Sequence, residues 1–133
     1  MVVPEKAKTM LESARTIAIV GVSDKPDLPS YGVAKYLLDN SKYELFFVNP
    51  VVTELFGKPV YPTLADVPAE IDIVDVFRKI SDLPGVFEAA YSKGAKNIWL
   101  QLGIEDRTLA QEAEARGIPV VMDRCIKVDF QNL

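Results

Sequence analysis

The sequence contains no histidine, and this absence excludes several classes of enzyme at once. Without an imidazole there is no Ser-His-Asp or Cys-His catalytic pair, no histidine ligand for a metal and no phosphohistidine intermediate. The carboxylates show no spacing typical of a calcium loop or of a glycosidase pair. We therefore expect a binding protein rather than an enzyme, and we predict no catalytic and no metal-binding residues.

Cysteine is nearly absent as well, and the single thiol, Cys125, excludes an intramolecular disulfide. One cysteine is typical of a reducing compartment. No apolar run approaches the length of a membrane span, and residues 1–13 carry charges where a signal peptide needs an apolar core. These features predict a cytoplasmic protein that has no membrane contact.

Positive charge is also scarce, since the net charge is −4 and the isoelectric point is near 4.8. No basic field exists to collect the phosphates of nucleic acid, which is therefore a poor partner. An anionic ligand must instead be held by local geometry. A length of 133 residues, of which 49% are apolar, accommodates one domain, which we assign to residues 1–133.

Short apolar runs alternate with segments of helical periodicity along most of the chain. The runs predict strands over residues 17–20, 44–48, 71–77, 97–102 and 119–122. Helices are predicted over residues 4–14, from residue 30 onward, over 82–93 and over 107–116. A loop with room for a short extended piece is predicted over 51–62, and a helical turn over 64–67. This alternation predicts an α/β fold: a Rossmann-like, doubly wound parallel sheet of about five strands in a single domain. The loops at the carboxyl ends of the strands then form one candidate site.

The loop after the first strand carries the clearest signal of binding. Gly21 ends the strand, and Ser30 is placed to cap the next helix, whose N-terminus favours a phosphate. The loop between them is longer than most strand-to-helix loops and contains Lys25. Glycines at positions 21 and 32 do not match the triple-glycine dinucleotide fingerprint. The same residues would also serve simply to turn and cap the first unit of any α/β protein.

The end of the second strand weighs against NAD as the ligand. A dehydrogenase of this fold usually has an acidic residue there that accepts a hydrogen bond from the ribose, whereas this chain has Asn49. Lys25 and Arg78, which follows the third strand, favour a ligand with additional phosphate charge. A small NAD(P)-dependent oxidoreductase or a dinucleotide-binding regulator remains the alternative.

The chain carries several short motifs between residues 15 and 127, and their combination is informative. They are Gly21-Val-Ser23, Pro29-Ser-Tyr31, Val48-Asn-Pro50, Tyr61-Pro62, Val74-Asp-Val-Phe77-Arg78, Trp99-Leu-Gln-Leu-Gly103 and Met122-Asp-Arg-Cys125-Ile-Lys127. In this combination the chain resembles the small stand-alone CoA-binding protein family. That family is similar in fold to the CoA-binding domain of the succinyl-CoA synthetase α subunit and of ADP-forming acyl-CoA synthetases. The resemblance implies that CoA or an acyl-CoA binds, with its pyrophosphate at the first loop.

The resemblance also implies which residues contact the ligand. Around the phosphates and the helix start it puts Gly21, Val22, Ser23, Lys25, Ser30 and Tyr31, and beside the nucleotide it puts Asn49, Pro50, Val76, Phe77 and Arg78. The ends of the fourth and fifth strands add Gly103 and Cys125. Lacking a histidine and a second catalytic domain, the chain is not expected to be a complete acyl-CoA ligase. The expected role is non-catalytic binding, carriage or redox sensing of CoA, with a protein partner or a homo-oligomer left open.

Cys125 itself has two interpretations. Cysteine is commonly buried as a small apolar residue. It also follows the fifth strand between Arg124 and Lys127, cations that favour a thiolate if they approach it. If the strand order is 3-2-1-4-5, the fifth strand lies two positions from the phosphate loop, about 10 Å away, within reach of the CoA thiol. The hypothesis is a mixed disulfide between Cys125 and CoA under mild oxidation.

Overall fold

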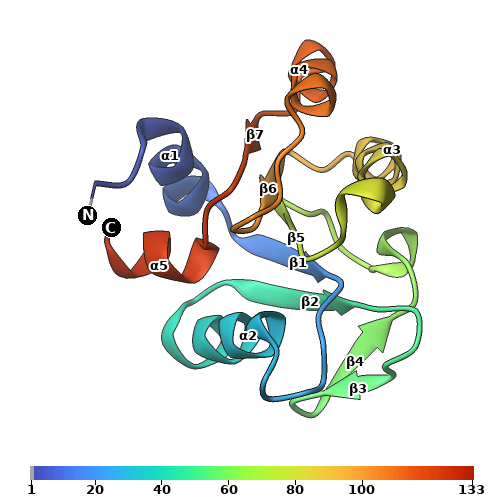
Figure 1. Ribbon diagram of the computed structural model, residues 1–133. Coiled ribbons are helices and arrows are strands. Elements are labelled where there is room, and N and C mark those ends of the chain that lie inside the picture. The colour runs from blue at the N-terminus through green and yellow to red at the C-terminus, as the bar shows by residue number, and fades with distance from the viewer. Residues whose placement is uncertain (1) are drawn as a thin grey trace.

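A seven-stranded sheet runs through the middle of the molecule, with its strands in the order β3-β4-β2-β1-β5-β6-β7 (Figure 1). The structure is a computed structural model that describes residues 2–133. The strands are β1 (Thr16–Val20), β2 (Glu44–Val48), β3 (Glu54–Leu55), β4 (Lys58–Tyr61), β5 (Ile73–Val76), β6 (Asn97–Leu100) and β7 (Val120–Val121). All neighbouring pairs are parallel except β3 with β4. The predicted Rossmann-like sheet is confirmed, with two strands more than predicted.

Helices cover both faces of the sheet. One face carries α1 (Glu5–Ser13), α2 (Pro29–Asn40) and α5 (Ile126–Gln131), and the other carries α3 (Leu83–Lys93) and α4 (Arg107–Ala115). Single turns of 3₁₀ helix lie at Leu64–Asp66 and Ile80–Asp82. Along β1, Ile17 and Ile19 pack toward the first group of helices and Ala18 toward the second. Because both faces are covered, the strand reads as one continuous apolar run.

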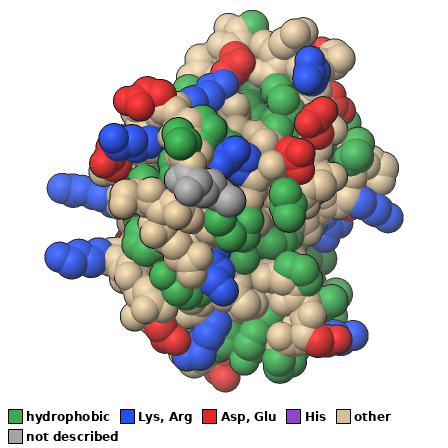
Figure 2. Space-filling model, turned by 60° about the vertical axis from the view of Figure 1, so that its left-hand side comes forward, with side chains coloured by type: hydrophobic (Ala, Val, Ile, Leu, Met, Phe, Trp, Pro, Cys, Tyr) green, Lys and Arg blue, Asp and Glu red, His purple; other side chains and the backbone are tan. Residues whose placement is uncertain are grey.

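The surface on the side of α1 and α5 is mixed in character. Figure 2 shows apolar side chains in the middle of this side, with Lys, Arg, Asp and Glu side chains around them. Within residues 2–133, no helix combines the length and the apolar character needed to cross a bilayer.

The two additional strands form a hairpin within residues 51–62, where a loop was predicted. Leu55 pairs with Lys58, and the two residues between them, Phe56 and Gly57, have φ angles of 54° and 75°. Positive φ at both central residues is the geometry of a type I′ turn, for which Asn-Gly is the usual sequence signal. Phe56 holds the unfavourable conformation because its ring packs 4.9 Å from the Tyr31 ring. The hairpin was missed because its turn does not use the usual residues.

The predicted strand order, 3-2-1-4-5, is wrong. The third predicted strand, β5, pairs directly with β1, so the predicted strands lie in the order 2-1-3-4-5. The hairpin explains the difference, because β4 occupies the open side of β2 and leaves β5 only the other side of β1. As a result β7 lies three positions from β1, about 14 Å at the usual spacing.

The chain after β7 turns back across the sheet and forms α5, which sequence analysis did not predict. The Arg124 N–H donates to the Leu100 carbonyl oxygen at 3.4 Å, and the Trp99 indole N–H donates to the Arg124 carbonyl oxygen at 2.8 Å. The Ile126 N–H then donates to the Gln101 side-chain oxygen at 3.2 Å. Residues 124–126 therefore lie over the carboxyl end of β6 rather than beyond β7.

Asp75 stands in the middle of β5 as a fully buried carboxyl group. Its neighbours in register are Ile19 on β1 and Trp99 on β6, and within residues 2–133 neither of its carboxyl oxygens has a hydrogen-bond partner. Burial therefore raises the pKa of Asp75 well above its ordinary value. The folded protein holds this group in its neutral, protonated form over a pH range in which the unfolded chain ionises it.

We expect Asp75→Asn to become progressively more stable than the native chain as the pH rises. From about pH 4 upward the unfolded native chain releases a proton that the folded chain keeps, so native stability falls by up to about 1.4 kcal/mol per pH unit. The amide carries no such proton. Urea unfolding of both proteins from about pH 4 to about pH 8 measures the difference, and a difference that stays constant would contradict the assignment.

Candidate functional site

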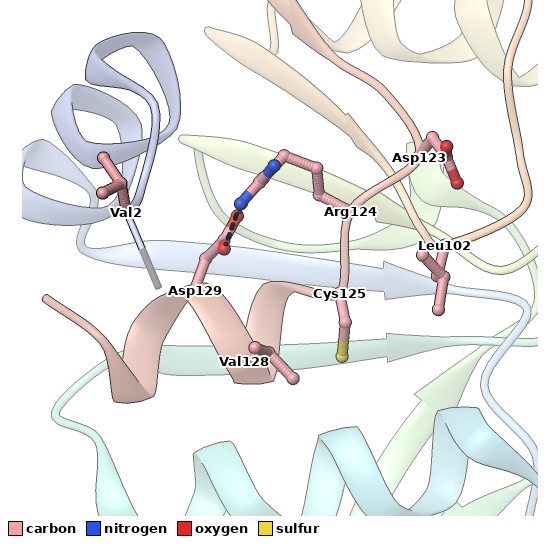
Figure 3. A pocket seen from close by; sticks show the side chains of 7 residues that line it. All are labelled: Val2, Leu102, Asp123, Arg124, Cys125, Val128 and Asp129. Carbon is pink, nitrogen blue, oxygen red and sulfur yellow. Dashed lines mark hydrogen bonds and ion pairs between the residues drawn. The ribbon is translucent and has the colours of Figure 1, made fainter.

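Among the hollows at the edge where the parallel strands end, one lies beside Gly21, after β1, and another beside Cys125, after β7. The first, about 270 Å³ in volume, is lined by Gly21, Pro50, Pro62, Arg78 and Val86, among others, and is called the β1–β5 cleft. The second, about 360 Å³, is called the α5 cavity and is lined by residues from the β6–α4 loop, the β7–α5 segment and α5 (Figure 3). Gly21, Pro50 and Arg78 of the predicted site therefore share one cleft, and Cys125 lines the other hollow.

Gly21 lies where the ends of three strands meet. Its N–H donates to the Val48 carbonyl oxygen at 2.9 Å, and the Phe77 N–H donates to the Val20 carbonyl oxygen at 2.8 Å. Its φ is +86°, and a Cβ atom at this position would lie 2.4 Å from the Phe77 carbonyl oxygen and 2.8 Å from Arg78 Cδ. Only glycine fits, so the Arg78 side chain rests directly against the loop backbone.

The loop between β1 and α2 closes on itself. Ser30 was predicted to cap α2, and this is wrong: α2 begins at Pro29, its N-cap is Leu28, and Ser30 lies inside the first turn. Proline at the first helical position fixes the start of the helix one residue earlier. The buried Ser30 hydroxyl oxygen instead accepts a hydrogen bond from the Ser23 N–H at 2.9 Å. This contact holds the loop against the amino end of α2 without a ligand.

Two cations, Arg78 and Lys25, flank this loop, and they differ in whether they make an ion pair. The Arg78 guanidinium makes an ion pair with Asp82 at 2.9 Å, and its side chain is 36% exposed. Lys25 is exposed and makes no ion pair within residues 2–133, although Asp24 and Asp27 stand beside it in the loop. An anion at this site would therefore meet Lys25 directly but would compete with Asp82 for Arg78. Asp82 was not predicted as part of the site, although its position four residues after Arg78 is a spacing at which ion pairs form.

Asn49 joins two loops at the end of β2. Its side-chain N–H donates to the Val22 carbonyl oxygen at 2.8 Å. Its side-chain oxygen accepts hydrogen bonds from the N–H groups of Val51 at 2.8 Å and Val52 at 3.1 Å. Direct contact of Asn49 with a nucleotide stays a prediction, but the amide already has a structural role in shaping the edge.

Two residues of the predicted site, Val22 and Val76, are completely buried. Val22 packs in the core beneath α1, α2 and α5, and Val76 packs in the core beneath α3 and α4. Neither presents any surface to a ligand in this structure, and their direct contact with one stays a prediction. Side chains at adjacent positions of an extended segment point to opposite faces. A sequence motif alone does not show which of its side chains face the core.

The remaining predicted residues lie at or near the edge. Tyr31 packs with Phe56 of the hairpin, and Phe77 is half-buried next to Arg78. Gly103 is exposed, has a φ of +84°, and donates its N–H to an Asp123 carboxylate oxygen at 2.7 Å. Their contact with a ligand remains a prediction, and Gly103 in addition ties the β6–α4 loop to the segment that follows β7.

Cys125 is half-buried, and Figure 3 shows its sulfur on the same side as Leu102 and Val128. The two cations expected to favour its thiolate are engaged elsewhere. Arg124 donates two hydrogen bonds to Asp129, at 2.6 and 2.8 Å, and these bonds raise the pKa of the Arg124 guanidinium. Lys127 lies 5.0 Å from the centre of the Tyr36 ring. The expected activation of the thiol by these cations is therefore wrong.

Cys125 still lies about two strand spacings from β1, because of the path of the chain after β7. Although β7 lies three strands from β1, residues 124–126 cross back over the end of β6, which is only two strands from β1. Two strand spacings again give about 10 Å. Cys125 and the Gly21 loop therefore lie on the same edge, and the mixed disulfide stays a prediction.

A doubly wound sheet with a glycine-centred loop at its carboxyl edge is the architecture of nucleotide-binding α/β domains. The model of the CoA binding domain family matches residues 15–131. The chain therefore belongs to the CoA-binding domain family.

Individual relatives agree with this assignment. The uncharacterized protein YneT of Bacillus subtilis is 39% identical over 127 residues, which cover 94% of this chain and 93% of YneT. A hypothetical protein from Pyrococcus horikoshii has a TM-score of 0.90 and 32% identity, covering 100% of this chain and 97% of that one. A dinucleotide-forming acetyl-coenzyme A synthetase from Ca. Korarchaeum cryptofilum, in complex with phosphate and ADP, has a TM-score of 0.71 and 25% identity, covering 80% of this chain and 25% of that one. The resemblance to the CoA-binding domains of acyl-CoA synthetases is confirmed.

Three glycine substitutions distinguish the loss of stability caused by the close contact at Gly21 from the loss caused by a positive φ angle alone. Gly117→Ala should lose about 1 to 2 kcal/mol of stability, because its φ is +89° but no atom lies within 4 Å of the new Cβ. Gly21→Ala should lose about 1 to 3 kcal/mol more, because its Cβ meets the Phe77 carbonyl oxygen. Gly32→Ala, in open space within α2, should gain about 0.5 to 1 kcal/mol.

Urea unfolding of the three variants measures these differences. Equal losses for Gly21→Ala and Gly117→Ala would show that the approach of Phe77 does not constrain the loop.

Proposed function

We propose that this protein binds coenzyme A or an acyl-CoA, without catalysing a reaction on it, at the carboxyl edge of the sheet. The observation that carries the proposal is the meeting of the Gly21 loop, the amino end of α2 and Arg78 at one edge, in a chain of the CoA-binding domain family. Each of these parts favours a phosphate, and CoA carries a pyrophosphate and a 3′-phosphate.

The pyrophosphate is proposed to lie at the Gly21–Ser23 loop. The dipole of α2 favours negative charge at this position, and Lys25 belongs to the same loop. The nucleotide is proposed to occupy the β1–β5 cleft, where Pro50 and Pro62 offer apolar surface. Arg78 stands between the two positions, so it supplies a charge-assisted hydrogen bond to a phosphate once it leaves Asp82.

The proposed role is that of a carrier. The 133 residues contain no histidine to hold a phosphoryl group. A dinucleotide remains the competing ligand, which a direct comparison of affinities separates from CoA.

We expect CoA to bind at least tenfold more tightly than dephospho-CoA or NADH in isothermal titration calorimetry. Lys25→Ala and Arg78→Ala should each weaken CoA binding about tenfold or more, the usual effect of losing a charge-assisted hydrogen bond. The melting temperature should change little for Lys25→Ala, because this side chain is exposed and has no ion-pair partner within residues 2–133. Tighter binding of NADH than of CoA would replace this proposal with the dinucleotide alternative.

Two control variants sharpen this experiment. Lys42→Ala removes an exposed cation just before the amino end of β2, at the opposite edge, and should leave CoA affinity unchanged. Asp82→Asn frees Arg78 from its ion pair and should leave affinity equal or higher. A loss of affinity in Lys42→Ala as large as that in Lys25→Ala would indicate a general charge effect instead of a local contact.

A redox-sensing role is proposed for Cys125, because its thiol lines the α5 cavity at the proposed ligand edge. In this step the Cys125 thiolate attacks one sulfur of CoA disulfide, the new sulfur–sulfur bond joins Cys125 to CoA, and the second CoA leaves as a thiolate. No oxidant other than CoA disulfide is needed.

Intact mass measurement after treatment with CoA disulfide should show one reducible CoA adduct on the native protein and none on Cys125→Ser. Binding at the edge should make CoA disulfide react faster than glutathione disulfide with the folded protein, and this preference should disappear in urea. Absence of the adduct, an equal adduct on Cys125→Ser, or the same preference in unfolded protein would contradict a directed reaction.

A further inference from the structure

The α5 cavity has apolar walls that the redox proposal does not explain. Leu102, Val128 and Cys125 point to one region of it (Figure 3). Leu102 is 71% exposed, and Val2, which also lines the cavity, is 87% exposed. Large aliphatic side chains that line a hollow of about 360 Å³ offer a binding surface for an apolar group.

The charged groups of the cavity are already engaged with partners of their own. Arg124 is held by two hydrogen bonds to Asp129, which is 1% exposed, and Asp123 accepts the Gly103 N–H. The lining thus contains two carboxylates and one guanidinium, a net charge of −1, with its one cation paired. A ligand group that ends in a carboxylate would be repelled here, whereas an uncharged one would not.

The cavity lies within reach of the proposed CoA site. Cys125 lies over the end of β6, two strands or about 10 Å from β1, where the Gly21 loop begins. The β1–β5 cleft borders α3, whereas the cavity borders α5. A ligand that holds its phosphates at the loop can therefore occupy the cleft with one end and the cavity with the other.

We propose that the α5 cavity receives the acyl group of a short, uncharged acyl-CoA, so that the preferred ligand is a thioester rather than free CoA. This inference rests on the proposed function, because it assumes that the CoA moiety is held at the Gly21 loop. It adds the class of ligand: an aliphatic acyl chain of a few carbons, without a terminal carboxylate, covers Leu102 and Val128 and leaves the Arg124–Asp129 pair intact.

Calorimetry with CoA, acetyl-CoA, butyryl-CoA and succinyl-CoA tests the inference on the native protein. Butyryl-CoA should bind about tenfold more tightly than acetyl-CoA, the effect of burying two additional methylene groups. Succinyl-CoA should bind no more tightly than acetyl-CoA. If no CoA compound binds, the proposed function fails. If CoA binds but its esters bind equally well, or succinyl-CoA binds most tightly, only the acyl inference is overturned.

Two variants locate the acyl group. Leu102→Asp replaces an exposed side chain of the cavity, so folding should be retained while the ratio of butyryl-CoA to acetyl-CoA affinity falls to about one. Val51→Asp is the matched control, because Val51 is 82% exposed in the segment after β2 but does not line the cavity. Val51→Asp should leave the ratio at its native value. A native ratio in Leu102→Asp would show that the acyl group lies elsewhere and would overturn the inference.

Discussion

The contact between Gly21 and Phe77 is the constraint on which the ligand edge depends. It requires the ends of β1 and β5 to approach so closely that a single carbon atom on residue 21 would collide with a carbonyl oxygen. The approach brings Arg78 against the loop, and Asn49 and Ser30 then fix the loop from the two other sides. The edge is thus pre-shaped by backbone contacts and does not need a ligand to assemble it, which lowers the entropic cost of binding.

Three cations near this edge already have internal partners, whereas Lys25 makes no ion pair within residues 2–133. Arg78 is paired with Asp82, Arg124 with Asp129, and Lys127 lies over Tyr36. In a protein of net charge −4 such pairing leaves little long-range attraction for a phosphorylated ligand. Selectivity must then come from the shape of the edge and from short-range exchange of partners, with Asp82 as the group that a phosphate displaces.

Sequence patterns predicted the parts of this protein that follow local rules. The buried strands and amphipathic helices were found because their apolar spacing is set by the sheet and helix periods, and Gly21 was found because its strand ends there. The strand order was wrong because the side of β1 on which β5 pairs is decided by a hairpin whose turn, Phe56-Gly57, relies on a distant tyrosine. The burial of Val22 and Val76 could not be predicted for a related reason: burial is decided by packing across the sheet. The ion pair of Arg78 and the return of residues 124–126 over β6 likewise depend on tertiary contacts, which sequence periodicity does not indicate.

The hairpin that sets the strand order also determines how the sheet ends. At one edge stands β3 and at the other β7, and each is only two residues long. Unpaired backbone groups on an edge strand invite pairing with another chain, and very short edge strands offer too few of them to support it. The longer strands are all interior. The same insertion that directs β5 to the far side of β1 therefore also protects this sheet from growing by association between molecules.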